Sequence, residues 1–111
     1  MIKTEYFDID VVNYKRIQEK YCDEIDKIKM KKILFDAKIN PGIFLFRING
    51  TQFNINVKSI VKMKDLLNTL GINIDKNTYF FFIFSLTIYT DDDRITIYQM
   101  NKKFKKEYYG T

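Results

Sequence analysis

Hydrophobic positions recur at three- and four-residue steps through the first third of the chain, over residues 11–35. This spacing places the apolar side chains on one face of a helix. The segment contains neither glycine nor proline, and Asp10 stands where a helix cap is expected. Pro41 and Gly42 mark a stop further on. The pattern therefore predicts one long amphipathic helix that begins at Val11.

Asn49 and Gly50 separate two runs of alternating apolar and polar residues within residues 43–57. Asn-Gly is a strong hairpin signal, because both residues tolerate the positive φ of a tight turn. A two-residue turn pairs Phe46 with Phe53 and places the large apolar side chains on one side of the hairpin. Turn and pattern agree, so a β-hairpin is predicted here.

A shorter helix is predicted over residues 59–71, with Ser59 as its cap and Gly71 at its end. Apolar residues recur there at helical spacing, and they would face the sheet. The members of this stripe are Ile60, Met63, Leu67 and Leu70.

Residues 79–90 contain no charge, glycine or proline and are rich in aromatic and β-branched side chains, which predicts one long strand. Its first half is apolar at every position, as in a strand covered on both faces. Residues 94–100 return as its partner after three aspartates. Ile88 and Ile95 share a face only if the loop between the strands holds two or four residues.

These elements predict an α+β fold in the order α-β-β-α-β-β, with a four-stranded antiparallel sheet of two hairpins packed with two helices. A chain of 111 residues is long enough to bury a core as a single domain, residues 1–111. Residues 102–111 are rich in lysine and are expected to be a loosely held basic tail.

A second face of the predicted sheet carries apolar side chains that point away from the core. Either a helix of the chain covers this face, or the face is exposed and marks an interface with a partner or a second copy. The candidate interface residues are Ile43, Leu45, Tyr79, Phe81 and Ile83.

The net charge of +5 is unevenly distributed, with −3 over residues 1–26 and +6 over residues 27–58. Such an asymmetry can steer an acidic partner or nucleic acid. The alternative is an ordinary solvated surface. The candidate contacts for nucleic acid or an acidic partner are Lys29, Lys31, Lys32, Lys102, Lys103, Lys105 and Lys106.

Candidate chemistry is sparse. The chain has no histidine and two serines, so a nucleophile–base pair is hard to assemble and the commonest metal ligand is missing. Asp91, Asp92 and Asp93 lack the ligand spacing of a calcium loop and predict a polar turn. Cys22 is the single cysteine and is expected to be a small buried side chain. We therefore expect no catalytic residue, no metal site, no cofactor and no enzymatic activity.

Composition also bears on origin and compartment. No stretch approaches the roughly 18 apolar residues of a membrane helix, and the first residues lack the apolar core of a signal peptide. The expected location is the cytoplasm, without membrane attachment. Isoleucine, lysine and asparagine dominate while Ala37 is the only alanine, which indicates an AT-rich genome: a bacterium, a phage, a mobile element or a virus.

Together these features favour a small non-enzymatic binding protein, encoded by a phage, a virus or a mobile element. It would occupy a surface of a host protein, and an inhibitor of a nucleic-acid-processing or defence complex fits this profile. Self-association is open as well. The alternative is a basic nucleic-acid-binding module, and salt-dependent binding to DNA or RNA would distinguish the two.

Overall fold

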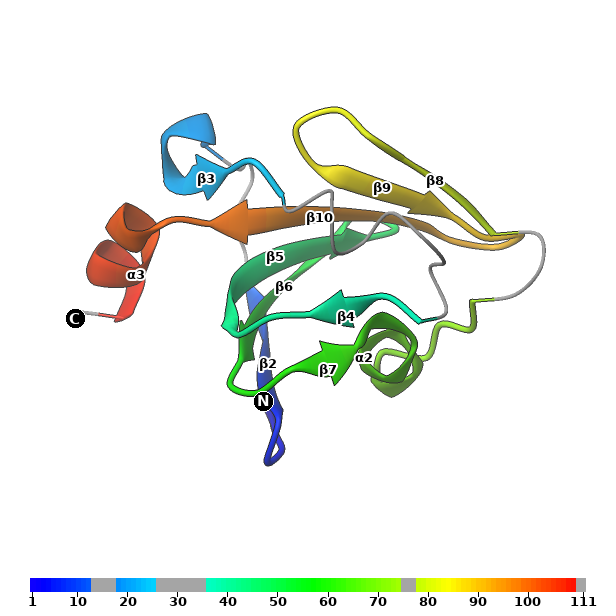
Figure 1. Cartoon of the computed structure of the whole chain (residues 1–111), viewed down its shortest axis with the longest axis horizontal. Helices are drawn as coiled ribbons and strands as arrows, with labels where there is room; N and C mark the ends of the chain where they lie inside the picture. Colours follow the sequence, from blue (N-terminus) through cyan, green and yellow to red (C-terminus); the bar gives the residue numbers. More distant parts are fainter. Residues whose placement is uncertain (13–17, 26–35, 75–77, 110–111) are drawn as a thin grey trace.

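Antiparallel strands make up most of the fold in the computed structural model, which describes residues 1–12, 18–25, 36–74 and 78–109 (Figure 1). The strands are β1 (Ile2–Lys3), β2 (Phe7–Val12), β3 (Cys22–Asp23), β4 (Lys38–Ile39), β5 (Gly42–Ile48), β6 (Thr51–Val57), β7 (Val61–Lys62), β8 (Tyr79–Phe82), β9 (Leu86–Tyr89) and β10 (Arg94–Met100). The helices are the 3-10 turn η1 (Glu19–Tyr21), α2 (Met63–Thr69) and α3 (Lys102–Tyr109).

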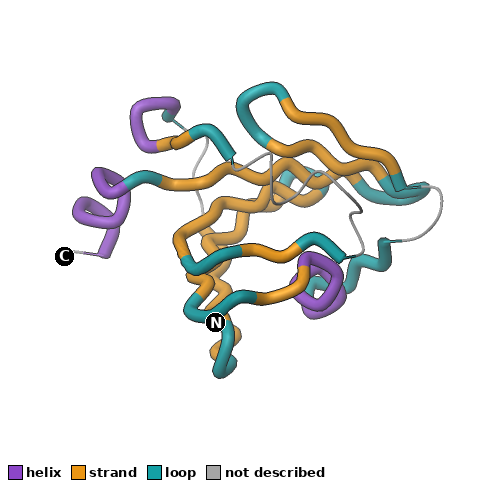
Figure 2. Tube along the Cα trace, viewed as in Figure 1, coloured by secondary structure: helices purple, strands orange, loops and turns teal. Residues whose placement is uncertain are grey.

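Eight of these strands form one antiparallel sheet in the order β1-β2-β6-β5-β10-β9-β8 (Figure 2). The eighth strand, β3, pairs with the end of β10 that β9 does not reach. β4 and β7 form a separate two-stranded sheet. In this order β6 lies between β2 and β5, and β10 lies on the other side of β5. The sheet therefore brings together strands from the start, the middle and the end of the chain.

The hairpin of β5 and β6 is confirmed with the predicted register, in which Phe46 pairs with Phe53 and Ile48 with Thr51. Asn49 and Gly50 have φ values of 49° and 89°, as a two-residue turn of this hand requires. The local turn therefore sets the pairing of the two central strands.

The pairing of β9 with β10 is also confirmed. Ile88 pairs with Ile95 and Leu86 with Ile97, and the loop between the strands is residues 90–93, an even number. All four aliphatic side chains are buried on one face of the sheet.

The predicted long helix over residues 11–35 is wrong wherever the chain is described. Residues Phe7–Val12 form β2, and η1 and β3 occupy positions 19–23. Phe7 and Ile9 alternate with Asp8 and Asp10, which is the two-residue period of a half-buried strand, and β6 supplies the pairing partner. The rest of this prediction, over residues 13–17 and 26–35, lies outside the described residues.

The single long strand over residues 79–90 is wrong as well. The segment folds back on itself as β8 and β9, which pair with each other through Tyr79 and Tyr89 at one end and Phe82 and Leu86 at the other. The turn is residues 83–85, closed by a backbone bond from the Ile83 amide to the Ser85 carbonyl over 3.2 Å. Folding back satisfies backbone groups that a single extended strand would leave for another partner.

The predicted fold class is corrected accordingly: the protein is mostly β, and its main sheet has eight strands instead of four. The predicted order α-β-β-α-β-β was wrong for two reasons. The segment predicted as a long helix contains β3 and overlaps the end of β2, and the segment predicted as one strand contains both β8 and β9. None of the described helices is long and apolar enough to cross a membrane.

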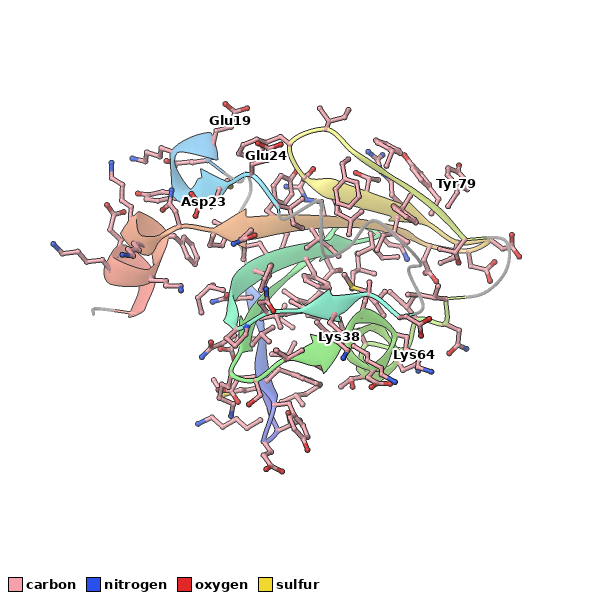
Figure 3. The ribbon with its side chains drawn as sticks, in the orientation of Figure 1. Glu19, Asp23, Glu24, Lys38, Lys64 and Tyr79 are labelled. Atoms are coloured by element: carbon pink, nitrogen blue, oxygen red, sulfur yellow. The ribbon has the colours of Figure 1, made fainter. Side chains whose placement is uncertain are left out.

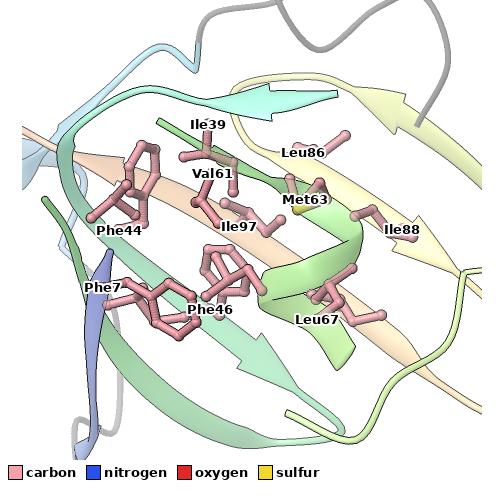
Figure 4. Close-up of a cluster of buried hydrophobic side chains, with 14 of the residues drawn as sticks. Phe7, Ile39, Phe44, Phe46, Val61, Met63, Leu67, Leu86, Ile88 and Ile97 are labelled. Carbon is pink, nitrogen blue, oxygen red and sulfur yellow. The ribbon is translucent and has the colours of Figure 1, made fainter. Parts of the chain in front are cut away.

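The main core lies between the sheet and a layer formed by α2, β4 and β7 (Figure 4). Helix α2 begins at Met63, later than predicted, because Val61 and Lys62 pair with β4. Met63 and Leu67 project from α2 toward Phe46 and Ile88 of the sheet, and all four are fully buried. Gly71 ends the helix region with φ of 83°, as predicted.

Helix α3 packs on the opposite side from this core, next to η1 and β3 (Figure 1). Phe104 of α3 is 6% exposed and contacts Tyr21 edge-to-face with ring centroids 5.9 Å apart. The Asn101 side chain accepts bonds from the amides of Lys103 and Phe104 and so caps the helix. Residues 102–109 therefore form a helix that has a side-chain cap and a buried ring, that of Phe104.

Candidate interaction surface

The main sheet has two faces with different chemistry. Its first face meets α2, β4 and β7 and is aliphatic and aromatic. Its second face is formed by the alternate residues of the same strands. Along the row through the middle of this face, Arg47 pairs with Gln52 and Thr96, Thr96 with Thr87, and Thr87 with Phe81. Polar, basic and aromatic side chains thus share the second face.

Three aromatic rings gather on this face at the β8 edge. Tyr79 stacks on Tyr89 with centroids 5.0 Å apart, and Phe81 stacks on Tyr89 with centroids 6.0 Å apart. The guanidinium carbon of Arg94 lies 5.7 Å from the Tyr89 ring centroid. Cross-strand aromatic pairs of this kind stabilise an antiparallel hairpin.

The hairpin of β8 and β9 carries four large exposed hydrophobic side chains, which we call the apolar hairpin patch. Their exposed fractions are 61% for Tyr79, 40% for Phe81, 76% for Ile83 and 39% for Phe84. Figure 3 shows Tyr79 beside β8, on the side of the molecule away from α2. Because β8 is the last strand in the sheet order of the described residues, the patch lies at a sheet edge.

A groove of about 540 Å³ runs over the second face next to this patch. We call it the arginine groove. Four strands contribute to it, together with the turn that connects β5 to β6 and the turn that connects β8 to β9. Its lining residues are Arg47, Asn49, Gly50, Phe81, Ile83, Ser85, Thr87, Arg94, Thr96 and Tyr98.

Both arginines of the groove have defined contacts. The Arg47 guanidinium donates a hydrogen bond of 3.4 Å to the Gln52 side-chain oxygen. The Arg94 backbone amide donates to the Asn49 side-chain oxygen over 3.0 Å. Since Arg47 pairs with Thr96, Arg94 is its diagonal neighbour on the adjacent strand, so both guanidinium groups project from the same face.

The structure divides the candidate interface predicted from the sequence. Ile43 and Leu45 are buried against Cys22, Met100 and Phe104, beneath η1, β3 and α3. Tyr79, Phe81 and Ile83 are exposed in the apolar hairpin patch. The five residues therefore do not form one surface.

The predicted lysine contacts are also separated. Lys102, Lys103, Lys105 and Lys106 lie on α3, where Lys105 is half-buried and the other three are exposed. None of them lines the arginine groove. Figure 3 shows the carboxylates of Glu19 and Asp23 on the neighbouring η1 and β3 segment. Lys29, Lys31 and Lys32 lie outside the described residues.

Cys22 is buried, as predicted, although it lies on β3 and not on a helix. Burial raises the pKa of its thiol from 9.0 to about 11, with smaller contributions from the Glu19 and Asp23 carboxylates. The thiol donates to the Gln18 carbonyl oxygen over 3.6 Å. These conditions oppose formation of the nucleophilic thiolate.

The three consecutive aspartates form a turn. The Asp93 carboxylate accepts bonds from the Asn49 side-chain amide over 2.7 Å and from the Thr90 hydroxyl over 3.4 Å. Within the described part of the chain, no group of three potential ligands among histidine, cysteine, aspartate and glutamate is placed to hold a metal ion.

A second groove of about 410 Å³ lies near α2 and is lined by Tyr6, Lys38, Ile60, Val61, Lys62 and Asp65. Its lining mixes two lysines with a carboxylate, so its charge is less one-sided than that of the arginine groove. Two exposed apolar side chains, Tyr6 and Ile60, flank it.

Sequence reasoning missed the two arginines of the groove. The two arginines become neighbours through the pairing of β5 with β10. No local sequence pattern predicts that the hairpin of β5 and β6 pairs with the hairpin of β9 and β10. Comparisons with models of protein families, with curated proteins and with solved structures find no match to this chain.

Proposed function

We propose that the protein is a small non-enzymatic binding protein that occupies a surface of a host protein through its apolar hairpin patch. The observation that carries the proposal is the exposure of Tyr79, Phe81, Ile83 and Phe84 within six consecutive residues. Exposed apolar side chains are common singly, but a contiguous group at one place is typical of an interaction site.

The position of the patch supports this role. Among the described residues β8 is an edge strand, and the outer side of an edge strand presents backbone donors and acceptors, here next to the exposed rings of the same hairpin. Aromatic residues supply much of the binding energy at protein interfaces, because they bury a large area with few rotatable bonds. The hairpin thus combines backbone and side-chain contacts within one small element.

The proposal includes a cytoplasmic site of action in a host cell and an origin in a phage, virus or mobile element. Its support is compositional: a single buried cysteine and an amino-acid bias typical of AT-rich genomes. Inhibition of a host complex would follow from occupation of a surface that the complex needs. The apolar hairpin patch, with its large exposed side chains, is suited to such a contact.

The test is site-specific photocrosslinking in the source cells. Phe84→p-benzoylphenylalanine places a crosslinker in the patch, and Tyr6→p-benzoylphenylalanine places the same group at an exposed ring near α2 as the matched control. We expect a discrete protein adduct from position 84 that position 6 does not give, identified by mass spectrometry.

Four outcomes would contradict the proposal. Equal adducts from both positions, or none from position 84, would remove the patch as a specific contact. An adduct with a second copy of the chain would replace a host partner with self-association. A nuclease-sensitive adduct would favour the nucleic-acid-binding alternative.

A further inference from the structure

We infer that the arginine groove receives an acidic segment of the partner protein, in which carboxylates flank a large apolar side chain. The inference rests on the proposed function, because the groove shares Phe81 and Ile83 with the apolar hairpin patch. A partner that covers the patch would therefore extend over the groove.

Charge complementarity is the first argument. Arg47 and Arg94 line the groove, and its described lining residues include no aspartate or glutamate. Asp93, the neighbour of Arg94 in the sequence, keeps its negative charge, but its carboxylate is directed to the side chains of Asn49 and Thr90 and is not part of the lining. The two guanidinium groups thus present a positive field that the lining itself does not neutralise.

Geometry is the second argument. Diagonal neighbours on adjacent antiparallel strands have Cα atoms about 7–8 Å apart, and this is the relationship between Arg47 and Arg94. A guanidinium group can bind a carboxylate through two parallel hydrogen bonds. The hydroxyls of Thr87 and Thr96 lie in the row beside Arg47 and add shorter polar side chains to the floor of the groove.

The apolar wall is the third argument. Phe81 and Ile83, from β8 and the turn after it, line one side of the groove. Arg47 on β5 and Arg94 on β10 lie toward the opposite side. An occupant must therefore offer apolar and anionic groups side by side. A protein segment with a leucine or an aromatic residue next to glutamate or aspartate has this chemistry.

The same side chains favour a protein segment over single-stranded nucleic acid. Stacking of bases requires a row of free aromatic faces, whereas the described lining supplies two rings, Phe81 and Tyr98, and one face of Phe81 already stacks on Tyr89. Ile83 is the most exposed apolar residue of the lining and has no ring. Binding of a phosphate backbone draws on several cations, and the four lysines of α3 do not line the groove.

The experiment titrates the isotopically labelled protein with defined probes and follows amide resonances by NMR. The probes are a synthetic peptide of repeated Glu-Glu-Phe-Gly units, the same peptide with glutamine in place of glutamate, and single-stranded oligothymidylate and oligouridylate. We expect the acidic peptide to shift the amide resonances of Thr87 and Thr96, and the glutamine peptide to bind roughly tenfold more weakly.

Two charge variants make the test specific. Arg47→Gln with Arg94→Gln should weaken binding of the acidic peptide roughly tenfold or more, because two charge-assisted contacts are lost. Lys102→Gln with Lys103→Gln removes the same charge from exposed positions on α3 and should change the affinity by no more than about twofold. Arg47→Lys with Arg94→Lys keeps the charge and loses the bidentate geometry, so its affinity should fall between wild type and the glutamine variant.

The inference is overturned if an oligonucleotide binds the groove more tightly than the peptide, if both glutamine variants weaken binding equally, or if the lysine variant binds as wild type does. It is also overturned if no probe shifts Thr87 or Thr96. The crosslink at position 84 distinguishes failure of the groove inference from failure of the proposed function. A Phe84 adduct that persists in the Arg47→Gln, Arg94→Gln background contradicts the groove alone, whereas a missing adduct in the wild-type background contradicts the proposed function.

Discussion

The side-chain amide of Asn49 donates a hydrogen bond of 2.7 Å to the Asp93 carboxylate, which joins the turn of one hairpin to the loop of another. Two further bonds reinforce the junction: the Arg94 amide donates to the Asn49 side chain, and the Asn49 amide donates to the Arg94 carbonyl over 3.1 Å. Because Arg94 lines the arginine groove, this link between loops also helps to position a groove residue.

Asp93→Ala should lower the free energy of unfolding by about 1–2 kcal/mol, because it removes the acceptor for Asn49 and Thr90. Urea denaturation measures the change. Asp92→Ala is the matched control, since Asp92 is exposed in the same loop and loses the same charge. Equal stability of the two variants would show that the junction between the loops contributes little.

Gly50→Val should destabilise the fold by roughly 1 kcal/mol or more, because a β-branched residue resists the φ of 89° at this position. Gly50→Asn is the control, since asparagine tolerates positive φ. Nothing lies within 4 Å of a Cβ added at Gly50, so the loss comes from the backbone and not from a clash. Thermal unfolding of both variants would test this, and a valine variant as stable as the asparagine variant would contradict it.

Phe46→Ala should cost roughly 3–5 kcal/mol, because Phe46 is fully buried against α2. Phe81→Ala, at an exposed position of the apolar hairpin patch, should cost about 1 kcal/mol or less. Chemical denaturation gives both values, and a large loss for Phe81→Ala would mean that the patch is structural core.

Phe104→Ala should release α3, because the Phe104 side chain is buried and contacts Tyr21. Hydrogen exchange of the α3 amides should become faster while exchange in β5 and β6 changes little. Lys103→Ala, one position away and exposed, serves as control. Unchanged protection of α3 in the Phe104 variant would show that other contacts hold the helix, such as the bond from the Tyr21 hydroxyl to Glu107.

Cys22 should react slowly with iodoacetamide at neutral pH. A pKa of about 11 in place of 9.0 lowers the thiolate fraction about 100-fold. The urea-unfolded protein, in which burial no longer raises the pKa, is the control and should react at the rate of a peptide thiol. Equal rates in the two states would contradict the prediction.

The same shift predicts a pH dependence of stability. The folded-state pKa of Cys22 lies above the unfolded value, so the protonated thiol stabilises the fold below pH 9. This contribution is lost as the pH rises through about 11. Cys22→Ala lacks this contribution. The free energy of unfolding of the wild type, relative to that of the variant, should therefore fall as the pH rises from 9.0 to about 11. A difference that is constant with pH would contradict it.

Local signals in the sequence were sufficient for two hairpins and for the end of α2. Asn49 and Gly50 define a two-residue turn, and the even loop between Ile88 and Ile95 follows from the requirement that both face the core. Gly71 ends its helix because glycine adopts positive φ at little cost. In each case the determining forces act between residues close in the chain, through turn sterics and alternation.

The rest depended on contacts between distant segments. β2 is a strand because β6 offers it a pairing edge, and the run over residues 79–90 divides because its two halves pair with each other. Ile43 and Leu45 are buried because η1, β3 and α3 cover them, whereas Ile83 is exposed. The arginine groove exists only once β5, β8, β9 and β10 lie side by side. Hydrophobicity along the chain shows which residues favour burial, but only the tertiary structure decides which of them are covered, since covering depends on long-range pairing that no local pattern encodes.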